Sequence, residues 1–377
     1  MSAPVTPSRK RGRAEEEEDL PPAKRELGQD EGAGAGGTAS APTAVEGEGQ
    51  ASLRAREAAR KDEEFWLEDG TVILVARDVE FRVYKGLLSS LSPVFKALFA
   101  ECQTLRRVSV DEQQTLSCPV VPVSDSPEDL RHLLRVCFTK RLGRLYDERH
   151  PSYHEISAAI RLGDKYKITE LYSQSLEYLK RHFPSTLDGW LALKRYGPPG
   201  WDDFEEIGVV NLARHTGELS LLPSALIACI CAQSTSDPGG KDKGIGHGFA
   251  REDGSREHLS ADDLTLCFDG KTNLRTATIA AVLRTFKPAA SAECRGAPRP
   301  RACEDALRGV LLGLEGTLDV LLGGDPFAGY EEFVDSDRLG LCKACKEMVR
   351  KRSYKERKDI WDRLPELLDV DVPGWRA

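Results

Sequence analysis

The chain has 377 residues, of which 40% are hydrophobic and 30% charged, and its formal net charge at pH 7 is −8. This length leaves room for two ordered units and tails. The negative charge and a pI of about 5.6 argue against a dedicated nucleic-acid-binding protein, which usually carries a strong basic patch. No apolar run approaches 18 residues, so we expect no transmembrane helix and no membrane partner.

The N-terminal end and the cysteines both bear on the compartment. The first residues turn basic with no apolar stretch behind them, so we expect no secretory signal. The ten cysteines form no dense, regular framework. In the reducing cytosol or nucleus they are thiols or metal ligands before they are disulfides. We therefore expect a nuclear protein, a cytoplasmic protein or one found in both places.

Residues 1–60 are predicted to form a disordered tail. As far as residue 52 they are rich in small residues, Pro and Glu, and they cannot bury enough apolar area to offset the entropy of ordering. Two basic clusters, Arg9–Arg13 and Lys24–Arg25, lie on either side of the acidic run Glu15–Asp19. Their spacing resembles a bipartite nuclear-import signal. The alternative is a mixed-charge tail that keeps the protein in solution.

The first folded unit is predicted to begin with a β-hairpin. Residues 71–76 are an apolar run of strand length, rich in β-branched side chains. After the turn Arg77-Asp78, residues 79–84 alternate between apolar and polar, as in a strand with one buried face. Ser92 and Pro93 then provide an N-cap and a first helical residue.

One more strand and three helices complete this unit. Residues 117–123 contain two prolines, which predict a strand at the edge of a sheet. Ser126 caps a helix with an acidic first turn. Apolar residues at helical spacing predict further helices at about 153–163 and 169–182. The order of elements predicts an α+β fold, in which a helical cluster covers a small β-sheet.

These segments together resemble the signature of BTB/POZ domains over residues 64–183. The matching stretches are Glu68–Ala76, Phe81–Leu88, Ser92–Phe95, Leu98-Phe99, and Ile160–Ile168 with Leu171. They are similar to a large family of mushroom-type (basidiomycete) fungal proteins with an N-terminal BTB domain, and this similarity runs from residue 64 to the C-terminus. The chain departs from that family at Tyr84 and Lys85, where the family usually has His and Arg. In other BTB domains these positions help to shape a charged central groove.

The resemblance implies a protein–protein interaction module that forms homodimers or recruits other proteins. One alternative is a substrate adaptor of a cullin-type ubiquitin ligase, whose cullin contact is loosely matched by Phe99-Ala-Glu101 and Val110-Asp-Glu112. No internal repeat is present to serve as its substrate-reading domain. Another alternative is a nuclear scaffold linked to transcription, although no DNA-binding motif accompanies the basic tail.

Residues 187–377 are predicted to form a mostly α-helical region. Residues 187–200, which include a Pro-Pro-Gly break, form the junction. Apolar spacing predicts four helices, at about 202–214, 223–232, 303–322 and 354–364. The Gly-, Asp- and Lys-rich segment 234–260 predicts an exposed loop with His247 at a flexible tip.

Four cysteines in this region point to metal chemistry. Cys342 and Cys345 form a C-x-x-C pair, and Cys294 and Cys303 lie upstream among turn residues. Four thiolates make a closed, structural zinc site with no open position for catalysis. The resemblance adds weight, since the fungal family shares cysteines here, whereas the spacing of Cys294 and Cys303 is not that of a zinc knuckle. The alternatives are buried thiols and a redox pair, which the missing βαβ pattern disfavours.

The sequence offers no catalytic constellation. It has no Walker loop, no dinucleotide-binding glycine motif and no nucleophile elbow. His150 and His154 are separated by Pro151-Ser152, which interrupts any shared helical face. We therefore expect no enzyme, no cofactor other than structural zinc and no direct nucleic-acid partner. The contrasting hypothesis is a metal-dependent enzyme in the C-terminal half.

Overall fold

The computed structural model describes residues 59–109, 115–138, 145–146, 150–194, 196–232, 235–236, 242–295, 301–317, 325–335 and 339–375. Nearly all of the predicted disordered tail, including both basic clusters, lies outside these residues. Within them, no helix combines the length and the apolar character that crossing a membrane requires.

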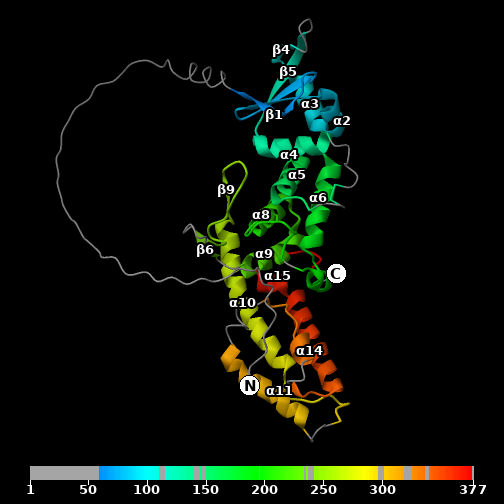
Figure 1. The fold of residues 1–377 in the computed structure, drawn as a ribbon, viewed down its shortest axis with the longest axis vertical. Coiled ribbons are helices and arrows are strands. Elements are labelled where there is room, and N and C mark those ends of the chain that lie inside the picture. The colour runs from blue at the N-terminus through cyan, green and yellow to red at the C-terminus, as the bar shows by residue number, and fades with distance from the viewer. Residues whose placement is uncertain are drawn as a thin grey trace, which may run out of the picture. The chain divides into compact units, whose positions relative to one another are not determined.

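A five-stranded mixed sheet opens the fold (Figure 1). Its order is β1-β3-β2-β5-β4. The strands are β1 (Arg60–Trp66), β2 (Val72–Ala76), β3 (Val79–Val83), β4 (Leu105–Ser109) and β5 (Thr115–Val123). The predicted hairpin is confirmed, because β2 and β3 pair antiparallel with Leu74 opposite Phe81, both fully buried. Strands β1 and β4 were not predicted, because most of their residues are charged or polar and exposed.

The prediction that the proline-containing strand lies at an edge is wrong. β5 pairs antiparallel with β4 through its first half and parallel with β2 through its second. The N–H of Val120 donates to the carbonyl of Thr104, so even-numbered N–H groups of β5 face β4. The backbone nitrogen of Pro122 points toward the β4 side, but it lies beyond the end of that strand. The backbone nitrogen of Pro119 points toward β2, one residue before the pairing of β5 with β2 begins. Neither proline removes a hydrogen bond from the sheet, so an internal strand tolerates both.

Five helices share a hydrophobic core with this sheet. They are α2 (Lys85–Leu91), α3 (Pro93–Glu101), α4 (Pro127–Phe138), α5 (Tyr153–Lys165) and α6 (Thr169–His182). Both predicted caps are confirmed: Ser92 Oγ accepts from the N–H of Phe95 at 3.0 Å, and Ser126 Oγ accepts from the N–H of Asp129 at 3.1 Å. α5 and α6 confirm the helices predicted from apolar spacing. α2 was not predicted, because its glycine and two serines are weak helix formers. The predicted α+β class is confirmed.

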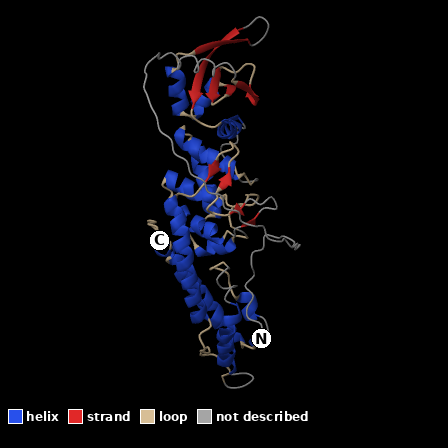
Figure 2. Cartoon of the chain, turned by 90° about the vertical axis from the view of Figure 1, so that its left-hand side faces the viewer, coloured by secondary structure: helices blue, strands red, loops and turns tan. Residues whose placement is uncertain are grey.

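The rest of the chain is mostly helical, as predicted (Figure 2). Its helices are α7 (Leu187–Ala192), α8 (Glu206–Thr216), α9 (Leu222–Cys231), α10 (Ala261–Thr285), α11 (Ala302–Leu312), α13 (Glu331–Asp335), α14 (Lys343–Asp362) and α15 (Leu364–Leu367), with 3-10 turns at Leu219–Leu221 and Gly313–Thr317. Two short strand pairs join β6 (Thr235–Ser236) to β7 (Asp242–Lys243) and β8 (Phe249–Ala250) to β9 (Arg256–Glu257). The four predicted helices correspond to α8, α9, α11 and α14, although α11 ends at Leu312 and α14 begins at Lys343.

Two sequence predictions in this region need correction, and one long helix was not predicted. The expected junction contains α7, whose Trp190 is 1% exposed. The ring of Trp190 packs on that of Trp361, with the two centroids 5.5 Å apart. Segment 234–260 was expected to be an exposed loop, but its second part is folded, because the β8–β9 hairpin buries Phe249 and Glu257. The 25-residue helix α10 was missed altogether. Its capping signal was present, since Ser260 Oγ accepts from the N–H three residues later.

Two hydrophobic cores lie within the described residues. The larger one runs from the sheet through α5, α6, α8 and α9 to Trp375, and therefore continues across the expected junction. The smaller one joins α10, α11 and α14 through Phe286, Leu307 and Val349, and it includes Cys303 and Cys345. The predicted metal ligands therefore lie in this second core or pack against it.

Candidate metal centre

Three separate elements bring the four predicted cysteine ligands together. Cys294 lies in the turn after α10, and Cys303 lies in the first turn of α11. Cys342 is the N-cap residue of α14, and Cys345 lies in the first turn of that helix. The four sulfur atoms all lie within 4.8 Å of one another. In the described part of the chain, no other group of three or more His, Cys, Asp or Glu side chains converges in this way.

One separation between the sulfur atoms matches that of a tetrahedral zinc site. Two thiolates that each lie about 2.3 Å from a tetrahedrally coordinated zinc are about 3.8 Å apart. The Sγ atoms of Cys342 and Cys294 are 3.8 Å apart. Zinc favours thiolate ligands in a closed set of four, so the cluster is compatible with a structural zinc site. Four cysteine ligands would complete the coordination shell and leave no position for a substrate.

Backbone amides support two of the sulfur atoms. The N–H of Ser291 donates to Cys345 Sγ at 3.4 Å, and the N–H of Cys342 donates to Cys303 Sγ at 3.4 Å. Both accepting cysteines are fully buried. Donors of this kind orient metal ligands and stabilise the negative sulfur. The turn after α10 and the start of α14 are therefore already arranged around the cluster.

The environment makes the thiols of the cluster unequal acids. Burial raises the pKa of Cys345 to about 12 and also raises the pKa of Cys303. The N–H of Cys345 points at Cys342 and holds the pKa of that thiol at about 7. A buried thiolate without a counter-charge is costly, and a cation between the sulfur atoms would supply that charge. A bound dication would stabilise the thiolate form of the four cysteines, which is the form that binds metal.

Of the residues named for a cullin contact, Phe99 is packed inside the domain and Glu101 is exposed. Phe99 is 3% exposed, and its ring stacks on that of Phe95 with centroids 5.6 Å apart. The second triplet, at 110–112, lies outside the described residues. Tyr84, at the position where the sequence departs from related domains, donates its hydroxyl to Asp69 at 2.7 Å.

Sequence reasoning missed a buried charge cluster around Glu257, on the β8–β9 hairpin. The carboxylate of Glu257 accepts from the hydroxyl of Tyr153 at 2.9 Å and from the guanidinium of Arg161 at 2.9 Å. Arg251, on the same hairpin, forms an ion pair with Asp129 of α4 at 2.9 Å. Burial and the charge of Glu257 raise the pKa of Tyr153 well above its usual value. The flanking Phe249 was the one signal that this segment packs against the rest of the protein.

Residues 64–183 match the family model of the BTB/POZ domain. This interval contains the five-stranded sheet from Glu64 onward, and it closes one residue after α6. Comparison with curated proteins finds no match.

Proposed function

Residues 64–183 form a BTB/POZ domain, a protein–protein interaction module, and from this premise we propose that the protein works by assembling with copies of itself and with other proteins. The family match, together with the sheet and helices that fill the matched interval, carries this proposal. The net charge of −8 and the closed cysteine cluster favour binding to proteins over nucleic-acid binding or catalysis.

The edge strand β4 is the surface proposed for self-association. It is hydrogen-bonded to β5 on one side only, and its Leu105 is 62% exposed. A free edge presents unpaired N–H and C=O groups to which a second strand can add. Because even-numbered positions of β4 face β5, the N–H of Arg107 faces the free side.

The proposal is tested by the mass of the full-length protein in solution. We expect a dimer for the wild-type chain. Arg107→Pro removes an outward N–H and leaves the β4–β5 ladder in place, so it should shift the dimer toward monomer, whereas Arg107→Ala should not. A wild-type monomer at micromolar concentration would contradict self-association, and equal masses for both variants would exclude this edge.

A zinc ion is proposed to hold the C-terminal helices together. The cluster draws one ligand from the turn after α10 (Cys294), one from the start of α11 (Cys303) and two from the start of α14 (Cys342 and Cys345). Bound zinc would link three elements whose shared core is small. Metal analysis of the purified chain should give one zinc per protomer, and less than about 0.1 zinc per protomer would contradict the site.

Nuclear entry through the basic clusters of the tail is also proposed. A fluorescent fusion of the full chain should accumulate in nuclei, and alanine substitution of Arg9–Arg13 together with Lys24–Arg25 should abolish the accumulation. An unchanged distribution would leave the clusters as ordinary parts of a charged tail.

A further inference from the structure

An open groove of about 1250 Å³ runs along α14 beside the four cysteines. One wall is an exposed stripe of α14 that contains Lys343, Lys351 and Lys355. The other wall is the turn after α10, which contains Glu293 and Arg295. Pockets for small molecules are roughly 300–1,000 Å³ in volume. The size of the groove therefore suits a segment of polypeptide better than a metabolite.

The groove carries an excess of positive charge. Five of its lining side chains are basic and two are acidic. Lys351 approaches Glu347 at 3.7 Å, a weak pair at the surface. Among the residues that the structure describes, Lys343, Lys355 and Arg295 have no carboxylate within 4.0 Å. These cations are exposed and free to bind an anionic partner.

The two walls are held in place by contacts that do not involve the three lysines or Arg295. The guanidinium of Arg352 donates to the backbone carbonyls of Lys287 and Ala289 at 3.1 and 3.3 Å. The sulfur atoms of Cys294 and Cys342, one on each wall, are 3.8 Å apart. The groove is therefore preformed, which lowers the entropic cost of binding.

The spacing of the lysines matches an extended chain. Lys351 and Lys355 are four residues apart on a helix, which is about 6 Å along its axis. Side chains on one face of an extended peptide repeat about every 6.6 Å. Lys343 lies eight residues before Lys351, about 12 Å, close to the span of four extended residues. An extended segment with carboxylates at positions 1, 5 and 7 would therefore meet the three lysines in turn, and an uncharged residue at position 3 would face Glu347.

We propose that this groove binds an extended acidic segment of a partner protein, with its carboxylates spaced four and then two residues apart. The proposal rests on the proposed function, since it names the chemistry of one protein with which the chain assembles. Met348 and Ala344 add apolar surface beside the lysines for the uncharged residues of the segment. A nucleic acid fits less well, because Glu293 and Glu347 would face its continuous row of phosphates.

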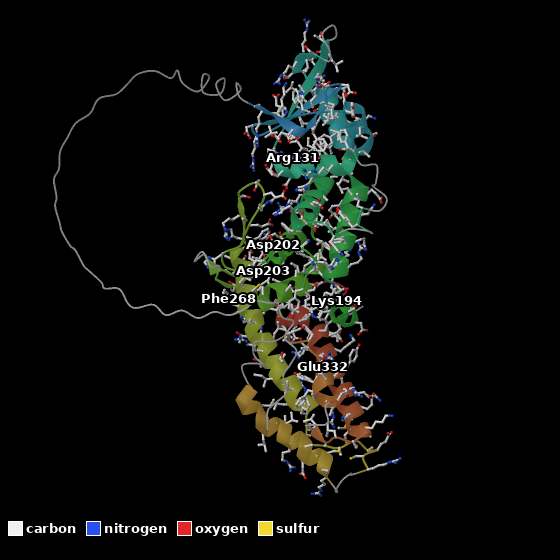
Figure 3. The ribbon with its side chains drawn as sticks, in the orientation of Figure 1. Arg131, Lys194, Asp202, Asp203, Phe268 and Glu332 are labelled. Carbon is white, nitrogen blue, oxygen red and sulfur yellow. The ribbon has the colours of Figure 1, made fainter. Side chains whose placement is uncertain are left out.

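The test uses the full-length, zinc-loaded protein and a fluorescein-labelled nonapeptide with glutamate at positions 1, 5 and 7 and serine at the other positions. Fluorescence anisotropy should show binding at least about tenfold tighter than for the same peptide with glutamine in place of glutamate, and the affinity should fall as salt rises. The charge reversal Lys351→Glu with Lys355→Glu should weaken binding at least about tenfold. The matched control is Lys96→Glu with Lys194→Glu, which makes the same change in net charge at exposed lysines outside the groove (Lys194 is labelled in Figure 3) and should leave the affinity unchanged.

Three results would overturn the proposal: no preference for glutamate over glutamine, equal losses in the two charge-reversed proteins, or tighter binding of a labelled single-stranded DNA of similar length. The mass of each sample separates this proposal from the proposed function. A dimer that does not bind the acidic peptide would overturn the groove proposal alone, and a monomer that binds the peptide would overturn self-association alone.

Discussion

Removal of the Glu257 carboxylate should destabilise the protein more than removal of any exposed carboxylate. Glu257 is 7% exposed, and it is the ion-pair partner of Arg161, whose side chain is only 25% exposed. In Glu257→Ala the charge of Arg161 stays largely buried and loses its nearest carboxylate. Loss of one partner from a buried pair costs about 3–5 kcal/mol. At about 2 °C per kcal/mol, the low end of the range for large domains, the Tm should fall by about 6–10 °C.

The assay is thermal unfolding followed by circular dichroism, with Glu64→Ala as the control. Glu64 pairs with Arg135 at 2.6 Å, but both side chains are more than 40% exposed. A surface pair of this kind contributes about 0–1 kcal/mol, so the Tm of the control should fall by less than about 2 °C. Equal Tm changes in the two variants would refute the idea that the β8–β9 hairpin is fixed by a buried charge.

Three further predictions concern metal, packing and pH. Cys345→Ser should lose bound zinc and also the stability that zinc adds, about 2.7 kcal/mol at a zinc concentration 100 times the Kd; an unchanged response of Tm to zinc would contradict this. Gly208→Ala should lower stability by about 1–3 kcal/mol in urea unfolding, because its Cβ would lie 2.0 Å from the hydroxyl of Tyr153. Burial lowers the pKa of His182 to about 4, below the 6.5 of an unfolded histidine, so the unfolded state binds the extra proton and stability falls as the pH drops from about 6.5 to about 4. His182→Gln should make Tm less dependent on pH across that window, and an unchanged slope would show that other groups control it.

Local signals in the sequence were sufficient for much of the first unit. The apolar run that became β2, the caps at Ser92 and Ser126 and the periodicity of α5 and α6 each act within a few residues, so they can be read without knowledge of the fold. The position of β5 depends on which N–H groups meet a neighbouring strand. The prolines alone could not show that neither of them interrupts the sheet.

The members of the four-cysteine cluster could be predicted from the sequence, whereas their geometry could not. The C-x-x-C pair can be recognised from its spacing in the sequence. Cys294 and Cys303 approach that pair only because α10 and α11 share a core with α14. α10 itself was missed because most of its buried positions hold small or polar side chains and because large apolar residues such as Phe268, 60% exposed, lie on its outer face (Figure 3). The ion pair of Glu257 with Arg161 joins residues far apart in the sequence, and no local sequence pattern predicts it.

The central claim, assembly through the BTB/POZ domain, is tested most directly by native mass spectrometry of the full-length protein, which reports oligomeric mass and bound metal in one spectrum. We predict the mass of a dimer that carries one zinc ion per protomer. A metal-free monomer at the same micromolar concentration would contradict both self-association and the four-cysteine site.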